Sequence, residues 1–120
     1  MSISVTTSYS DSTAIQVTTT AGNAMSIEVL ANPSNATIMF VQLFDSAAPT
    51  LGTDTPIVVV PIQTYAAGGS RAKDKTVFAN GGVRCTTGIN MFVTNTAAAN
   101  TTAAAGTNAP QEVRVFWTPV

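Results

Sequence analysis

Two apolar runs joined by a polar connection constrain the fold of this chain most strongly. Residues 38–44 (IMFVQLF) and 57–62 (IVVVPI) are almost wholly apolar, and residues 45–56 between them are rich in Pro, Gly, Thr and Asp. The second run begins with β-branched residues, which favour a strand and disfavour a helix. The pattern predicts strand, long loop, strand, with the first strand central and covered on both faces or lying at a subunit contact.

The rest of the chain repeats short strand signals separated by turns. Apolar residues alternate with polar ones in residues 3–6, 15–18, 25–29 and 113–117, so Met25, for example, should share the core side with Ile27 and Val29. Residues 83–95 predict one further long strand, and no segment shows a convincing helical pattern. We therefore expect an all-β fold, an antiparallel β-sandwich or barrel of about eight strands, for which a jelly roll is one candidate topology.

The length of the chain fits one domain. At 120 residues, a single β domain spanning residues 1–120 can bury a core without disulfides, and the one cysteine leaves no intrachain partner. We expect a flexible loop at residues 66–75 (AAGGSRAKDK) and a low-complexity loop or arm at residues 96–110 (TAAANTTAAAGTNAP). The second segment either orders against a partner or is a loose hairpin loop, and both interpretations stay open.

The charge composition favours contact with other protein. Only 9% of the residues are charged and the net charge is −1, against about 25% charged residues in a typical domain. Little electrostatic repulsion separates copies of such a chain, although a secreted protein with a neutral surface would look the same. Five basic residues make a poor footprint for phosphates, so nucleic acid is not an expected partner. Neither a membrane-spanning run nor a signal peptide is apparent, so no membrane contact is expected.

The sequence offers no recognisable catalytic chemistry. It contains no histidine, which removes Ser-His-Asp and Cys-His nucleophile pairs and all His-based metal sites. Cys85 is expected to be a buried structural thiol, and the scattered acids are expected to cap turns, with a cation site at Asp45 or Asp54 as the less favoured alternative. We therefore predict no enzyme activity, and no catalytic, cofactor-binding or metal-ligating residues.

Two stretches carry a resemblance to a known class of proteins. Residues 43–62 (LFDSAAPTLGTDTPIVVVPI) and 81–94 (GGVRCTTGINMFVT) resemble a pattern in small structural proteins of tailed bacteriophages. In that pattern a strand enters a (D/N)-x-A-x-P-T-x-G-T-D-T-P loop, which is followed by an apolar strand ending in Pro. A later glycine-rich turn enters a G-(L/V)-R-x-x-T-G strand. The resemblance implies a virion structural protein, a capsid decoration (cement) protein on the surface of the phage head, made in the host cytoplasm. A tail or receptor-binding β module that contacts host-surface carbohydrate is the alternative.

The resemblance also implies the partners, which are the major capsid protein and further copies of the chain, with a homotrimer favoured. It transfers no site residues, so the contact residues are predicted from their chemistry and position. Three are the basic residues of the 66–75 loop, Arg71, Lys73 and Lys75, for which a solvated loop is the alternative interpretation. The others are Asn100 in the low-complexity arm and Phe116, which would mark an oligomer face if it points away from the core.

Overall fold

The molecule is built from antiparallel strands. The computed structural model describes residues 2–7, 15–30, 39–62, 73–94 and 112–119, and within these ranges it contains nine strands and no helix. The strands are β1 (Ser2–Thr7), β2 (Ile15–Thr18), β3 (Gly22–Leu30), β4 (Met39–Asp45), β5 (Val58–Ile62), β6 (Lys73–Val77), β7 (Val83–Cys85), β8 (Ile89–Thr94) and β9 (Glu112–Pro119). The all-β prediction is confirmed.

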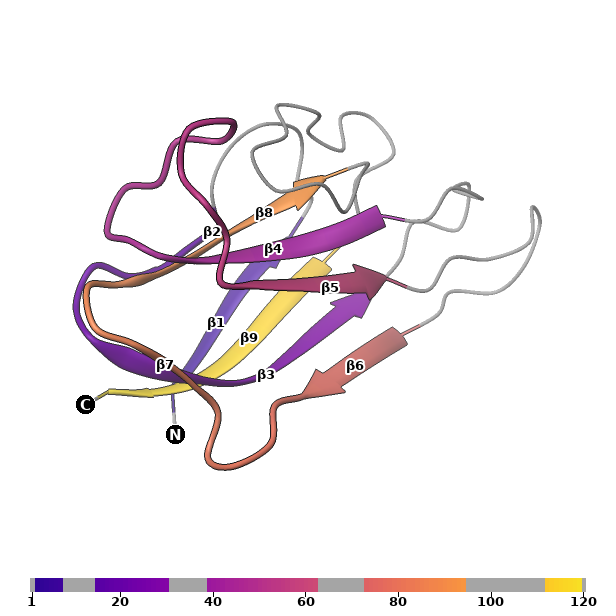
Figure 1. The fold of residues 1–120 in the computed structure, drawn as a ribbon. Helices are drawn as coiled ribbons and strands as arrows, with labels where there is room; N and C mark the ends of the chain where they lie inside the picture. Colours follow the sequence, from indigo (N-terminus) through magenta and orange to yellow (C-terminus); the bar gives the residue numbers. More distant parts are fainter. Residues whose placement is uncertain (1, 8–14, 31–38, 63–72, 95–111, 120) are drawn as a thin grey trace.

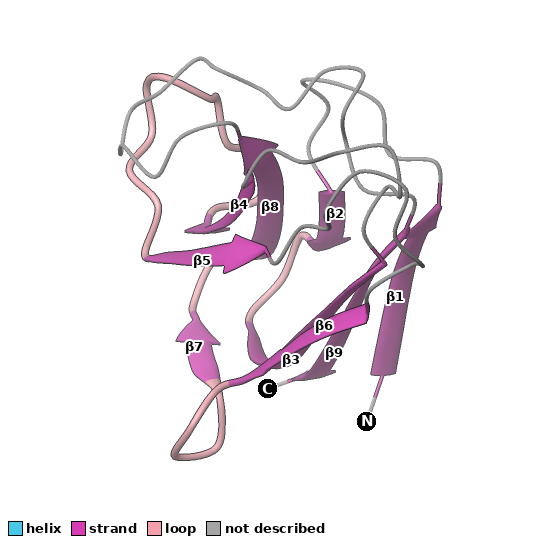
Figure 2. Cartoon of the chain, turned by 90° about the vertical axis from the view of Figure 1, so that its right-hand side faces the viewer, coloured by secondary structure: helices cyan, strands magenta, loops and turns pink. Residues whose placement is uncertain are grey.

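The strands form two sheets that lie face to face (Figures 1 and 2). Sheet A has the order β1-β9-β3-β6, and the short β7 also pairs with β3. Sheet B has the order β2-β8-β4-β5. Every pair in both sheets is antiparallel, so the predicted antiparallel sandwich is confirmed.

The strand pairs are nested around the connection between β4 and β5. β4 pairs with β5, β3 with β6, β2 with β8 and β1 with β9. A long hairpin folded over on itself gives this nesting, and its strand order is that of a jelly roll. The two apolar runs that constrain the sequence most strongly, β4 and β5, are therefore the innermost pair of the nest.

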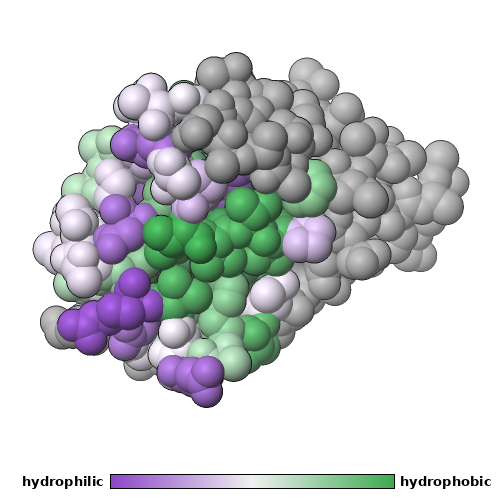
Figure 3. Space-filling model, in the orientation of Figure 1, coloured by the Kyte–Doolittle hydropathy of each residue, from purple (hydrophilic) through white to green (hydrophobic). Residues whose placement is uncertain are grey.

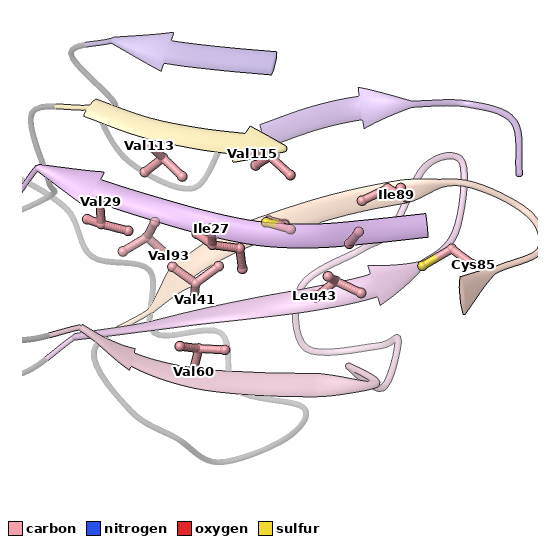
Figure 4. Packing of buried hydrophobic residues seen from close by; sticks show 12 residues of the cluster. Ile27, Val29, Val41, Leu43, Val60, Cys85, Ile89, Val93, Val113 and Val115 are labelled. Carbon is pink, nitrogen blue, oxygen red and sulfur yellow. The ribbon is translucent and has the colours of Figure 1, made fainter. Parts of the chain in front are cut away.

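The core lies between the two sheets. Side chains from both sheets point toward one another there, with Ile27 and Val29 of β3 close to Val41 of β4 and Val93 of β8, and with Val113 and Val115 of β9 alongside (Figure 4). These six side chains are at most 3% exposed, and those from one strand stand at alternate positions, because alternate side chains of a strand face the same side. Trp117 follows Val115 by two residues in β9, so it faces the same side, and it packs partly buried against the core cluster.

On the two inner strands of sheet B, β4 and β8, the side away from the core is buried as well. Gln42, Phe44, Asn90, Phe92 and Thr94 are each at most 4% exposed, although none belongs to the core cluster between the sheets. The rings of Phe44 and Phe92 meet edge to face at 5.7 Å, and Gln42 Nε2 donates to Thr94 Oγ1 at 3.2 Å. The prediction that the first apolar run is a central strand covered on both faces is confirmed.

A bulge in β3 changes which residues face the core. The register with β9 shifts between Ala24 and Ser26, so Met25 is an extra residue in the ladder. Ala24 is buried before the bulge and Ile27 and Val29 after it, whereas Met25 is only half-buried. Simple alternation, which places Met25 on the core side with Ile27, is wrong here because the bulge offsets the alternation by one residue.

Two predicted boundaries are also corrected. The long strand expected at residues 83–95 is two strands in different sheets, β7 and β8, separated by a bend at residues 86–88. The loop expected at residues 66–75 is shorter, because β6 begins at Lys73 and pairs with β3 from Leu30 onward. The remainder of that loop and the predicted arm at residues 96–110 lie outside the described residues.

Candidate functional site

The carboxylate of Asp45 holds the bend that carries the chain from sheet A to sheet B. Its Oδ2 accepts hydrogen bonds from the backbone N–H of Thr86 at 3.0 Å and from the Thr86 hydroxyl at 3.1 Å. Its Oδ1 accepts from the N–H groups of Thr87 at 2.8 Å and Gly88 at 3.4 Å. We call this arrangement the Asp45 clamp. Both oxygens face donors, so the carboxylate does not suit a cation.

The environment of Asp45 favours its charged form. Partial burial raises the pKa of this carboxyl, but the N–H and hydroxyl donors of the bend together outweigh it and hold the pKa below its ordinary value. Gly88 has room for no side chain, because a Cβ there would lie 2.8 Å from the carbonyl oxygens of Ser46 and Thr18. The clamp thus joins the end of β4 closely to the bend that precedes β8.

Cys85 is a structural thiol, as predicted. It is completely buried in the core cluster, and burial, followed by the negative charge of Asp45, raises its pKa to about 11. A thiol in this state is a poor nucleophile and a poor metal ligand. No group of three or more metal-ligating acidic, Cys or His side chains occurs within the described ranges.

The loop between β4 and β5, residues 46–57, is anchored at both ends. At its start, Asn90 Nδ2 donates to the carbonyl oxygen of Ser46 at 2.6 Å. At its end, the N–H of Ile57 donates to the carbonyl oxygen of Leu43 at 2.8 Å. In Figure 1 the loop projects beyond the strands of sheet B. We refer to it below as the β4–β5 loop.

The tip of the β4–β5 loop is also held by its own hydrogen bonds. The N–H of Thr50 donates to Asp54 Oδ2 at 2.6 Å, and the N–H groups of Thr53 and Asp54 donate to the Thr50 carbonyl oxygen at 3.1 and 3.0 Å. Asp54 therefore caps a turn, as the sequence predicts for acids in this loop. A loop fixed in this way loses little conformational entropy when it contacts a partner.

Three of the five predicted contact residues lie in described strands of sheet A. Lys73 and Lys75 belong to the edge strand β6, where Lys75 pairs with Glu28. Phe116 lies in the inner strand β9, opposite Ser26, at the parity that alternates with the buried Val115, and is half-buried. Arg71 and Asn100 lie outside the described residues.

Sheet A brings Lys75 and Phe116 into neighbouring rows. One row runs across the strands through Arg114, Glu28 and Lys75, and the next runs through Phe116, Ser26 and Val77. Val77 ends β6 and is 70% exposed, which makes it the most exposed large apolar side chain in the described ranges. The sequence contains no signal for the exposure of Val77, because the sheet order decides which strands lie at an edge.

A second apolar surface follows β5. Ile57 is 46% exposed, Val59 is half-buried and Pro61 is exposed, at alternate positions of the chain. We call these three residues the β5 stripe. Figure 3 shows strongly apolar surface over β5, bordered by polar residues. Contiguous apolar surface with a polar border is typical of a protein contact site.

The described residues contain no helix that could cross a membrane. No family model matches this chain, and no curated protein or solved structure is detectably similar to it.

Proposed function

We propose that this protein is a decoration (cement) protein of a tailed-bacteriophage head, which binds the outside of the shell and stabilises it. The observation that carries the proposal is the exposure of apolar side chains, the β5 stripe and Val77, on a firmly packed jelly roll. Jelly rolls are common in viral capsid proteins. The resemblance of residues 43–62 and 81–94 to phage structural proteins supports the same function.

The mechanism would be adhesive. The β4–β5 loop is held at both ends and at its tip before any partner arrives, so little ordering opposes its binding. Apolar contacts of the β5 stripe would add to it. Many copies on one shell make weak single contacts strong in combination. The proposed partners are the major capsid protein and further copies of this chain.

Binding to purified heads tests the proposal directly. Shells that lack decoration are mixed with the protein and pelleted, and the pellet is then imaged. We expect the protein in the pellet at a fixed ratio to the capsid subunit, with density at regular positions of the lattice. A protein that stays in the supernatant, or that is found only on tails, would rule out a decoration role.

A carbohydrate-binding module is the alternative, since lectins also use jelly rolls. Sugar sites commonly present exposed aromatic rings, but none of the described aromatic side chains is fully exposed, and Phe40 and Phe116 are half-buried. Phe44 and Phe92 are buried, and Phe78 and Trp117 pack against the core. Strong, specific signals on a glycan array, together with no binding to shells, would favour this alternative.

A further inference from the structure

The turn between β6 and β7 contains the one Asn-Gly pair of the chain, Asn80-Gly81. Residues 78–82 form this turn, which projects beyond the strands of sheet A (Figures 1 and 2). Both residues of the pair are exposed. Asparagine is one of the thermolabile residues of proteins. A following glycine makes it most reactive, because glycine has no side chain to hinder the approach of its backbone nitrogen to the asparagine side chain.

The geometry of the turn leaves that backbone nitrogen free. Asn80 has a φ of +57° and Gly81 a φ of +83°, and the N–H of Gly82 donates to the carbonyl oxygen of Ala79 at 3.2 Å. Two central residues with positive φ and this hydrogen bond make a type I′ turn. Such a turn uses the N–H of Gly82, and the N–H of Gly81 makes no hydrogen bond within the part of the chain that the structure describes.

The surroundings of this asparagine differ from those of the other described asparagines. A Cβ built on Gly81 would have no heavy atom within 4 Å beyond its chain neighbours. Asn90, in contrast, is buried in β8 and donates to the carbonyl oxygen of Ser46. Asn23 lies inside β3, which pairs there with a strand on each side. Of these three side chains, that of Asn80 alone lies in an exposed turn with room to react.

We propose that Asn80 is a site of spontaneous deamidation, at which the native protein forms aspartate and isoaspartate. The nitrogen of Gly81 gives up its proton and bonds to Cγ of Asn80. The bond from Cγ to the side-chain nitrogen breaks, and ammonia leaves a cyclic imide. Water then opens this ring, at Cγ to give aspartate or at the backbone carbonyl carbon to give isoaspartate. The whole reaction exchanges an amide and water for a carboxylate and ammonia, with no oxidation or reduction.

Ring closure needs a brief opening of the turn. It brings the nitrogen of Gly81 onto Cγ of Asn80, a geometry that a type I′ turn does not hold. The hydrogen bond that closes the turn joins Gly82 to the exposed Ala79, and exposed turns open locally at far lower cost than the whole fold. We therefore expect the native protein to react at most about tenfold more slowly than the chain unfolded in urea.

The two products should affect the fold differently. Aspartate adopts the left-handed conformation about as readily as asparagine, so it should keep the turn. Isoaspartate adds a carbon to the main chain and displaces Gly82, whose backbone lies so close to β3 that a Cβ on it would be 2.5 Å from the Ala24 carbonyl oxygen. The isoaspartate form should therefore unfold at a lower temperature than the unmodified protein. Either product changes the net charge from −1 to −2.

Peptide mass spectrometry of the incubated native protein tests the site. We expect the peptide that contains Asn80 to gain about one mass unit. The gain should be faster at about pH 9 than at about pH 6, because the attacking nitrogen must lose its proton. Peptides that contain Asn23 and Asn90 are internal controls and should keep their mass. Asn80→Gln should abolish the gain, because its longer side chain closes a ring much less readily.

A second measurement follows the consequence for the fold. Ion exchange separates the modified forms from the unmodified protein by their added negative charge, and thermal unfolding compares them. Asn80→Asp supplies the aspartate form directly and should unfold as the wild type does. The isoaspartate form should unfold at a lower temperature than Asn80→Asp, although the two carry the same charge. An isoaspartate form as stable as Asn80→Asp would contradict the close packing of Gly82 against β3.

Three results would overturn the site itself. They are a native Asn80 peptide that keeps its mass while the same peptide reacts in urea, equal mass gain at Asn80 and at the buried Asn90, or an unchanged gain in Asn80→Gln. None of these measurements involves shells or a partner. The inference therefore goes beyond the proposed function, and either can fail without the other.

Discussion

Asp45 connects two parts of the described chain that lie far apart in sequence. It ends β4, and its carboxylate accepts hydrogen bonds from a bend more than forty residues later in the sequence. The bend cannot pair in either sheet while it crosses between them, so its N–H groups need another acceptor. A charged carboxylate is a strong acceptor for such groups. The crossing between sheets therefore depends on one side chain.

Replacing Asp45 by Asn should destabilise the protein by about 1–3 kcal/mol at neutral pH, because an amide offers one acceptor oxygen where the clamp uses two. The matched control is Asp54→Asn, since Asp54 accepts one of the described backbone hydrogen bonds and should matter less. Urea unfolding followed by fluorescence gives both values. Equal losses for the two variants would contradict the clamp.

The effect of Asp45→Asn should also depend on pH. The folded pKa of Asp45 lies below its ordinary value of 3.8, so its charge stabilises the fold above that pH. This contribution is lost as the pH falls through the lower, folded value, since protonation then costs the clamp its acceptor. The difference in unfolding free energy between wild type and Asp45→Asn should be constant above about pH 5 and shrink below about pH 4. A difference that grows in acid would refute this account.

Cys85 provides a direct measure of how firmly the bend is closed. Its thiol is completely buried and its pKa is raised to about 11, so both access and ionisation oppose its reaction. We expect labelling at pH 8 to be at least about a thousandfold slower in the native protein than in urea, where the thiol is exposed. Asp45→Asn should accelerate native labelling by opening the bend. Native labelling as fast as in urea would show that Cys85 is accessible.

At the scale of elements, strand positions are more predictable than strand connections. Alternation locates the core residues of β8 and β9, and the apolar runs locate β4 and β5, because a strand with one or two buried faces must show these patterns. The predicted long strand at 83–95 is wrong in a specific way. Cys85 and Ile89 both lie in the core, but the bend between them depends on the distant Asp45. A contact over that separation leaves no local signal.

The turn between β6 and β7 contains a glycine that close packing requires. Gly82 has a φ of +98°, and a Cβ there would lie 2.5 Å from the Ala24 carbonyl oxygen, whereas nothing lies within 4 Å of a Cβ on Gly81, whose φ is +83°. Gly81→Ala should cost about 1–2 kcal/mol through its left-handed backbone alone. Gly82→Ala should cost about 1–3 kcal/mol beyond that, because the turn must also move away from β3. Equal unfolding free energies for the two variants would contradict this close approach.

At the scale of the whole molecule, the fold class is readable from the sequence, but which apolar side chains remain exposed is not. The jelly roll follows from strands that pair in nested order around the β4–β5 loop, and the sequence already marks that loop by its Pro, Gly and Asp content. The contact residues predicted from charge and composition, Lys73 among them, are separate from the exposed β5 stripe. Which side chains are exposed depends on how the strands assemble into sheets. In the sequence, a valine of an edge strand looks the same as a valine of a central strand.

The apolar surface and the basic residues predict different effects of salt on the binding of the protein to shells. If the apolar β5 stripe and the β4–β5 loop, whose one charged residue is Asp54, dominate, affinity for purified shells should change by less than about threefold between low and high salt, because salt screens charges and leaves apolar contacts in place. If Lys73, Lys75 and Arg71 dominate, affinity should fall steeply over the same range. Ile57→Thr should weaken shell binding only if the apolar contacts dominate, and Lys75→Gln should weaken it only if the basic residues dominate. With a net charge of −1 and five basic residues in the chain, we expect the first result.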